Sequence, residues 1–235
     1  IGLCLVGSEM CIRDRSSNDV EIYVSTTDSN GKSRLDIEKN RFIQKEERLF
    51  VKYYYEQVIN RISLSFIFGI WSDIKNSDLV YIQYLFHYTV LFSLFFSLMQ
   101  RKKIVISPRG SFSSFTLSNK LPILKARWLN LFIDPFWRSI TWHASSYLEY
   151  NDIKKRFQHS KIEVINDGVD FASFQKFKKY KKHLLLEKYT NTRFEDISNI
   201  FFSMGRLHPI KDFGLLIDAF APVSYTHLTL PTNCV

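Results

Sequence analysis

Cysteine is scarce in this 235-residue chain and confined to its ends. The three cysteines are Cys4, Cys11 and Cys234, so the interior of the sequence holds neither a disulfide framework nor a cysteine-based metal site. Glycine (8 residues) and proline (6 residues) are also few, which leaves little sequence for long flexible linkers. These shortages exclude a disulfide-stapled domain and a collagen-like fibre, and they are compatible with a reducing compartment.

The residues that are abundant are apolar, aromatic and basic. Hydrophobic residues make up 46% of the chain and charged residues 23%, which excludes a disordered polar protein and allows a sizeable core. Aromatic residues reach 16%, and the formal net charge is +9 with a pI of about 9.4. This charge favours an anionic partner, namely a nucleic acid, a phosphorylated substrate or a membrane surface.

The two terminal strings differ from the rest of the chain. Residues 1–15 and 222–235 resemble translated sequencing-adapter read-through, and we expect both to be artefacts that take no part in the fold. A clipped signal peptide is the alternative for 1–15, but that string has no basic n-region and only a short apolar run. On this interpretation the genuine part is a fragment cut at both ends, and the first strand of its domain is missing.

Strand-like and helix-like segments alternate along the interior. Strands are expected at 20–26, 48–55, 78–86, 103–107, 140–145, 161–165 and 199–207. Helices are expected at 59–76, 89–103, 146–157 and 211–221, and in pieces over 120–139. Segment 78–86 is apolar on both faces, as in a parallel sheet that helices cover on both sides. The pattern predicts an α/β fold with a mostly parallel sheet.

These elements form two blocks. Residues 16–172 are expected to make one domain, 173–198 a linker, and 199–221 the start of a second domain that is cut off. Within the first block, 81–99 is nearly long enough for a membrane span. Gln83 and His87 lie inside it, however, so a buried strand followed by a core helix is the better prediction.

Ligands of open parallel sheets bind beyond the carboxyl ends of the strands, and this rule selects candidate residues in the first block. They are His87, Arg109, Gly110, His143 and Asp170. For His87 the alternative is a satisfied polar group at a helix start, and for His143 it is a histidine packed under the sheet. An arginine cannot act as a base near neutral pH, so Arg109 is interpreted as a group that binds an acceptor or a phosphate.

The same rule selects Gly205, Arg206 and Lys211 in the second block. Glycine allows a ligand to approach the backbone, and two cations at the start of a helix suit a diphosphate. The alternative is that both cations are merely solvated loop residues.

Five segments resemble, in order, motifs of the family 4 glycosyltransferases. They are 78–86, similar to Asp-Val-Val-His-Val-His-Gly-Leu-Trp; 107–120, similar to a Pro-His/Arg-Gly loop; 142–157, similar to a His-Ala-Thr-Ser helix start; 164–170, similar to Val-Ile-Pro-Asn-Gly-Val-Asp; and 201–221, similar to a strand end with Gly-Arg-Leu and the helix that follows. The resemblance is best over 201–221 and 142–170 and thin before residue 78.

The resemblance implies the GT-B fold, in which two Rossmann-like domains with helices on both faces of each sheet meet across a cleft. It implies a hexosyltransferase-type enzyme that moves a sugar from a nucleotide sugar to a hydroxyl acceptor, usually with retention and with neither a metal nor another cofactor. The donor diphosphate would lie on Gly205, Arg206 and Lys211. The acceptor would be a glycan or lipid-linked molecule in cell-surface polysaccharide or glycolipid synthesis.

A lipid-linked acceptor would place the protein in the cytoplasm, in peripheral contact with an anionic membrane face, with no nucleic acid as partner. The sequence departs from the family pattern at Tyr81 and Gln83, where the family often has two histidines. The family's paired glutamates and its glycine-rich loop have no counterpart in the chain, which is therefore expected to be inactive by itself.

Two other functions compete with this one. A nucleic-acid-binding α/β protein would use the same basic and aromatic residues, although no zinc spacing or RNP-like string accompanies them. A non-catalytic GT-B scaffold is the third hypothesis.

Overall fold

The structure is a computed structural model that describes residues 2–6, 20–30, 33–57, 62–168, 203–205 and 209–220. The chain divides into two compact units, residues 1–169 and residues 170–235. The strands of the first unit are β1 (Gly2–Val6), β2 (Glu21–Thr27), β3 (Ser29–Asn30), β4 (Ser33–Arg34), β5 (Phe42–Glu46), β6 (Leu49–Tyr54), β7 (Leu79–Gln83), β8 (Lys103–Ser107), β9 (Ile140–Ala144) and β10 (Lys161–Val164). Its helical segments are α1 (Leu64–Lys75), α2 (Tyr88–Met99), α3 (Ser114–Ser118), α4 (Pro122–Trp128), the π-helix η3 (Leu129–Ile133), the 3₁₀ helix η4 (Asp134–Ser139) and α5 (Tyr147–Arg156).

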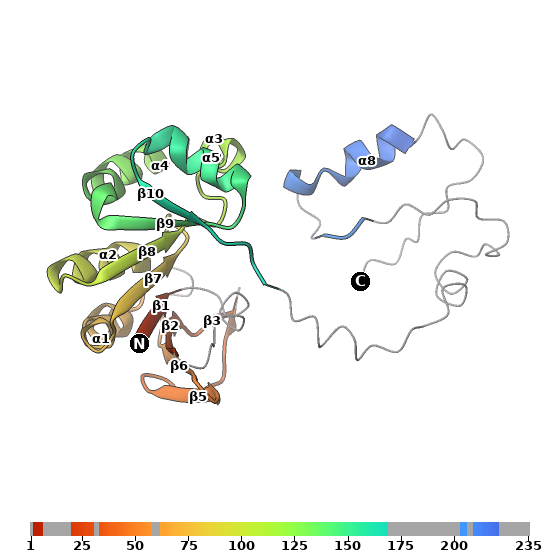
Figure 1. Ribbon diagram of the computed structural model, residues 1–235. Helices are drawn as coiled ribbons and strands as arrows, with labels where there is room; N and C mark the ends of the chain where they lie inside the picture. The colour runs from red at the N-terminus through yellow and green to blue at the C-terminus, as the bar shows by residue number, and fades with distance from the viewer. Residues whose placement is uncertain are drawn as a thin grey trace, which may run out of the picture. The chain divides into compact units, whose positions relative to one another are not determined.

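Eight strands form one sheet in the order β10-β9-β8-β7-β1-β2-β6-β5 (Figure 1). All neighbours pair in parallel except β5, which is antiparallel to β6. On one side of β1 lie the next strands of the chain, β2 and β6, and on its other side lie the later ones, β7, β8, β9 and β10, in that order. The direction of the strand order therefore reverses between β1 and β7. This is the strand order of Rossmann-like domains, so the α/β prediction with a parallel sheet is confirmed.

The place where the first strand was expected to be missing is filled by β1. Gly2–Val6 pairs in parallel with β2 on one side and with β7 on the other. The expectation that residues 1–15 stand outside the fold is therefore corrected for this segment. The physical reason is that an interior position of a parallel sheet needs only a short run of apolar, strand-forming residues, which Leu3, Leu5 and Val6 supply. The adapter-like origin of the two terminal strings stays a prediction.

Both faces of β7 are buried, as its sequence predicts. Val80 and Ile82 belong to a large hydrophobic cluster with residues of α1, α2, η3 and α5, while Tyr81 belongs to a second cluster around β2 and β6. Full burial of a large aliphatic side chain stabilises the fold by about 1.5–3 kcal/mol. The central strands are therefore held from both sides, which fixes the loops at their carboxyl ends.

Helix α1 begins and packs as a helix of its sequence should. Ser63 is the N-cap, and its hydroxyl accepts a hydrogen bond from the Phe66 N–H at 3.0 Å. Phe66, Ile70 and Ile74, spaced four residues apart, are all fully buried. The expected helix 59–76 is thus confirmed over its main part, although it starts at Leu64.

Helix α2 follows β7 after a short turn, so the expectation of a strand and a core helix over 81–99 is confirmed. Within the described residues, no helix combines the length and apolar character that a membrane crossing requires. The helix expected at 89–103 ends at Met99, so the basic residues 101–103 lie beyond it. Lys102 instead donates to the carbonyls of Lys75 and Ser77, at 2.9 and 2.6 Å, at the C-terminal end of α1.

The two edge strands carry charged residues. At one edge is β10, where Lys161 and Glu163 are exposed and Ile162 and Val164 pack toward the core. At the other is β5, which was not expected from the sequence and exposes Gln44 and Lys45. Strand β10 therefore alternates polar and apolar side chains, whereas in β5 two apolar residues are followed by three polar ones.

The second unit contains the 3₁₀ helix η6 (Pro209–Lys211) and helix α8 (Phe213–Phe220) among its described residues. The helix expected at 211–221 is confirmed, two residues shorter at its start and one at its end. The strand expected at 199–207 lies mostly outside the described residues, and the described part, 203–205, is not a strand.

Candidate functional site

A cavity of about 460 Å³ opens at the carboxyl ends of β2 and β7. Its described lining combines hydroxyl groups (Ser25, Thr26, Thr27, Thr89, Ser111), an amide and an imidazole (Gln83, His87), and aromatic rings (Phe66, Tyr84, Phe86). This is the edge of the sheet that the strand-end rule selects, beside the point where the strand order reverses. The size falls in the usual range for small-molecule pockets, about 300–1,000 Å³.

His87 is the sequence-predicted residue that the structure places in this cavity. It is the N-cap residue of α2, but its side chain makes no capping hydrogen bond. Its Nδ1 lies 2.8 Å from the Thr89 hydroxyl oxygen. Burial lowers the pKa of His87 below 6.5, and the nearby Glu56 carboxylate opposes this only in part. The imidazole is therefore neutral near pH 7 and can accept a proton or a hydrogen bond.

The lowered pKa of His87 predicts a pH-dependent stability. Because the unfolded chain binds the proton more readily, the contribution of neutral His87 is fully present above a pH of about 6.5 and is lost as the pH falls through the folded-state pKa. A His87→Gln variant should lose less stability between about pH 7.5 and pH 5 than the wild type does. Urea unfolding at both pH values measures this, and identical losses in the two proteins would contradict it.

Gln83 brings a second polar group into the cavity wall. Its side chain is 3% exposed, and its amide oxygen has no hydrogen-bond partner among the described residues. A buried acceptor without a protein partner is costly in general, and in a cavity wall it is suited to a hydroxyl donor on a ligand.

The loop after β8 is held by a buried carboxylate. Glu149 of α5 accepts hydrogen bonds from the Gly110 N–H at 2.7 Å and from the Ser145 N–H and hydroxyl, each at 2.8 Å. The Ser146 hydroxyl caps α5 by accepting a hydrogen bond from the Glu149 N–H at 3.2 Å. Gly110 has a φ of 74°, a conformation that favours glycine. The fixed loop presents Ser111 to the cavity.

Arg109, in the same loop, forms an ion pair with Asp167. Its Nη1 lies 2.7 and 2.6 Å from the two carboxylate oxygens. Asp167 belongs to the segment that follows β10. The guanidinium thus links the two loops, and its expected binding of an acceptor or phosphate stays a prediction.

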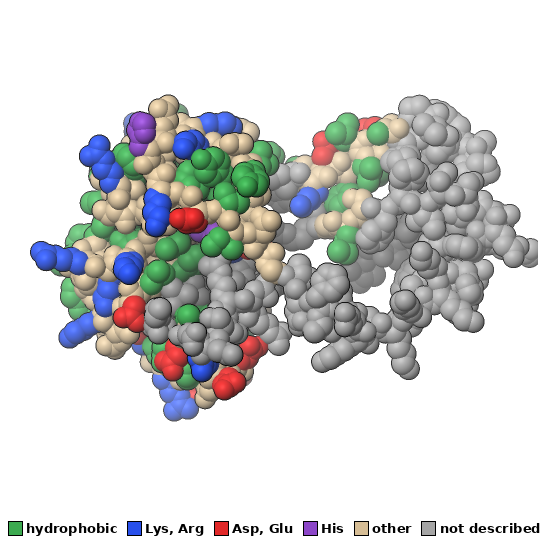
Figure 2. Space-filling view, viewed as in Figure 1, with side chains coloured by type: hydrophobic (Ala, Val, Ile, Leu, Met, Phe, Trp, Pro, Cys, Tyr) green, Lys and Arg blue, Asp and Glu red, His purple; other side chains and the backbone are tan. Residues whose placement is uncertain are grey.

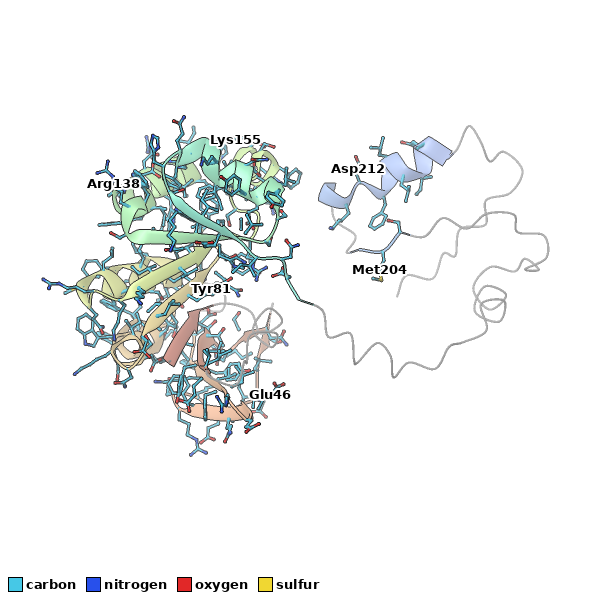
Figure 3. The ribbon with its side chains drawn as sticks, viewed as in Figure 1. Glu46, Tyr81, Arg138, Lys155, Met204 and Asp212 are labelled. Atoms are coloured by element: carbon cyan, nitrogen blue, oxygen red, sulfur yellow. The ribbon has the colours of Figure 1, made fainter. Side chains whose placement is uncertain are left out.

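His143 lies in the sheet interior, 2% exposed. Its Nδ1 is 2.6 Å from the Tyr81 hydroxyl and its Nε2 is 2.8 Å from the Ile165 carbonyl oxygen. Since a carbonyl only accepts, Nε2 donates the proton and the neutral Nδ1 accepts from Tyr81. Tyr81 is labelled in Figure 3 at the centre of the sheet. This geometry matches the alternative given above, a histidine packed under the sheet. His143 is not among the described residues that line the cavity.

The second unit brings two of its predicted residues together. A Cβ built on Gly205 would lie 3.6 Å from the Lys211 side chain and 3.4 Å from the Phe213 ring, so the lysine stem covers the glycine backbone. Asp212, labelled in Figure 3, accepts from the Leu215 N–H at 3.3 Å and so places its own carboxylate at the start of α8. Arg206 and Asp170 lie outside the described residues.

Three cavity residues were not predicted from the sequence, although the strand-end rule selects them. Ser25, Thr26 and Thr27 close β2, whose strand was predicted, and their hydroxyls follow its apolar core residues directly. Applying the rule to the first predicted strand, as it was applied to the later ones, would have found them.

Two other kinds of site are relevant in the described part of the chain, a metal site and a basic surface for nucleic acid. Among the described residues, no three His, Cys, Asp or Glu side chains gather in a way that could hold a metal ion. Figure 2 shows Lys and Arg side chains of the first unit dispersed over the visible face, with Asp and Glu among them. This face therefore offers no continuous basic stripe of the kind that follows a nucleic-acid backbone.

No protein-family model matches this chain, and no curated protein matches it. A sucrose-phosphate synthase from Thermosynechococcus elongatus is a similar solved structure, with 8% sequence identity and a TM-score of 0.47 over 72% of this chain and 48% of that one. The chain thus spans about half the length of that protein. A likeness of this degree carries no argument about activity, and the Rossmann-like α/β fold rests on the strand order itself.

Proposed function

We propose that this chain is the acceptor-binding part, with the entry to the donor-binding part, of a glycosyltransferase of GT-B type. Its reaction transfers a sugar from a nucleotide sugar to a hydroxyl acceptor, a glycan or lipid-linked molecule, with retention and without a metal. The observation that carries the proposal is the cavity at the carboxyl edge of the sheet, lined by hydroxyl, amide, imidazole and aromatic groups. The five motifs that resemble family 4 glycosyltransferases support it.

The lining suits a ligand that is itself covered with hydroxyl groups. Serine and threonine hydroxyls both donate and accept, the Gln83 amide oxygen accepts, and the neutral His87 accepts. A saccharide matches this mixture because each of its hydroxyls also does both. Phosphate and carboxylate ligands fit less well, because no Lys or Arg is among the described lining residues.

The proposed chemistry assigns the two units different tasks. In the first unit, neutral His87 holds an acceptor hydroxyl and orients it in the cavity. In the second, Lys211 and Arg206 stabilise the negative charge that forms on the departing nucleoside diphosphate. We propose that the protein acts at the cytoplasmic face of the membrane, where a lipid-linked acceptor would be presented.

The proposal is tested by saccharide binding to the chain. Isothermal titration with a panel of neutral oligosaccharides should give saturable binding, whereas inorganic phosphate should not compete. Random-sequence oligonucleotides should bind more weakly than the best saccharide at physiological salt. Saturable, steeply salt-dependent oligonucleotide binding without saccharide binding would overturn the proposal in favour of a nucleic-acid-binding protein.

Replacement of Gln83 by leucine gives a specific prediction. The leucine removes the hydrogen-bond acceptor that Gln83 offers in the cavity. The dissociation constant for the bound saccharide should therefore rise about tenfold, which is equivalent to the loss of one good hydrogen bond. Stability should stay unchanged or rise, because a buried acceptor without a protein partner is lost. The matched control is Gln158→Leu, at an exposed position after α5, which should leave binding as it is. Equal affinity in Gln83→Leu and wild type would contradict the prediction.

A further inference from the structure

Tyr84 adopts a backbone conformation that tyrosine rarely takes. Its φ is 67°, in the left-handed region, directly after the last residue of β7. Its N–H donates to the Ser107 carbonyl at 2.9 Å, which ties the turn to the end of β8. A bulky residue in this region is strained, whereas glycine is not. The family string that resembles 78–86 has glycine at the corresponding place, so tyrosine is the departure.

The left-handed turn has a geometric consequence for the cavity. Successive side chains of a regular strand point to opposite faces of the sheet. Gln83 and Tyr84 are successive residues, yet both line the same cavity. The left-handed turn at Tyr84 breaks the alternation, so both residues line the cavity.

The Tyr84 ring is open to a ligand. The side chain is 46% exposed, and its hydroxyl makes no hydrogen bond to the described residues. The fold therefore buries only part of the side chain, and the hydroxyl adds no hydrogen bond among the described residues. Strained residues of this kind concentrate where a ligand is held.

We infer that Tyr84 and Gln83 together bind one pyranose ring of the acceptor, with Tyr84 as the stacking platform and Gln83 as the acceptor of a ring hydroxyl. The inference rests on the proposed function. A pyranose whose hydroxyls are mostly equatorial presents its C–H groups on its two faces and its hydroxyls around its edge. The faces of aromatic rings are electron-rich and attract such C–H groups, while the edge hydroxyls reach the amide and the Ser and Thr groups. The substrate class is thus a pyranoside with mostly equatorial hydroxyls, for which a β-glucoside serves as the probe.

Variants of Tyr84 separate stacking from folding. Titration of the chain with a β-glucoside oligosaccharide is compared with titration with sorbitol, which has the hydroxyls but no ring face. Tyr84→Phe should bind the oligosaccharide like the wild type, whereas Tyr84→Ala and Tyr84→Gly should each raise its dissociation constant about tenfold. Sorbitol should bind weakly and equally to all four proteins. Glycine at position 84 removes the backbone strain, so Tyr84→Gly can be measured even if the alanine variant folds poorly.

The control is Tyr147→Ala, which removes a tyrosine that is 78% exposed on α5 and is not among the described cavity-lining residues. It should leave oligosaccharide binding unchanged. If the wild type binds the oligosaccharide and Tyr84→Gly binds it equally well, the stacking inference fails and the proposed function stands. If the wild type binds no saccharide, both fail.

Discussion

Replacing Asp73 with alanine is expected to lower the free energy of unfolding by about 3–5 kcal/mol. Asp73 lies on α1 and its side chain is 4% exposed. Its carboxylate accepts from the Ser25 hydroxyl at 2.7 Å, from the Tyr54 hydroxyl at 2.5 Å and from the Lys52 ammonium at 2.9 Å. The alanine would leave three donors without their acceptor, one of them a cation that is only 14% exposed.

The measurement is urea denaturation of the two proteins at neutral pH. The control is Glu163→Ala, which breaks the exposed ion pair with Lys161, 3.8 Å long, and should cost less than about 1 kcal/mol. A loss for Asp73→Ala as small as that of the control would show that the buried carboxylate does not hold α1 on the sheet. Because Ser25 also lines the cavity, saccharide affinity should fall together with stability.

Replacing Gly69 with alanine should destabilise the fold by about 1–3 kcal/mol, as overpacking does. On helix propensity alone, the change from glycine to alanine in mid-helix would stabilise α1 by about 1 kcal/mol. A Cβ at this position, however, would overlap the Tyr54 ring, lying 2.7 Å from Cζ and 2.5 Å from the hydroxyl oxygen. Tyr54 is 2% exposed and hydrogen-bonded to Asp73, so it has no room to retreat.

Thermal and urea unfolding of Gly69→Ala decide the sign of this effect. Phe68→Ala, at a position 79% exposed on the same helix, should change stability by no more than about 0.5 kcal/mol. In a Tyr54→Leu background the alanine at position 69 should cost less, because the two sites contact each other. A stabilised Gly69→Ala protein would mean that α1 can shift away from the sheet.

Much of the first unit follows from local pattern. The strand at β7 is predictable because its first four residues are apolar, as a strand buried on both faces requires. Helix α1 is predictable because its buried apolar residues recur every four positions. The β5 strand escapes prediction because it is half exposed at an edge, where few positions need to be apolar. Its antiparallel pairing with β6 depends on the turn between them rather than on the composition of the strand.

Some features of the candidate site can also be predicted from the sequence, and others cannot. His87 is predictable because it follows a strong strand signal, and Gly110 because glycine signals an unusual backbone. The packed position of His143 was one of the two expectations, but its partners are not predictable, since Tyr81 and Ile165 lie 62 and 22 residues away in sequence. The left-handed turn at Tyr84 is equally hidden, because tyrosine carries no turn signal and only the three-dimensional path of β7 demands it.

The charged residues on the two outermost strands have a consequence for assembly. A further strand from another molecule would have to lay its backbone along β10 beside Lys161 and Glu163, or along β5 beside Lys45, and strip water from those groups. Growth of the sheet from copy to copy is thereby opposed at both ends. The parallel core can stay rich in aliphatic strands without templating fibrils, so long as Lys161, Glu163 and Lys45 keep their charge.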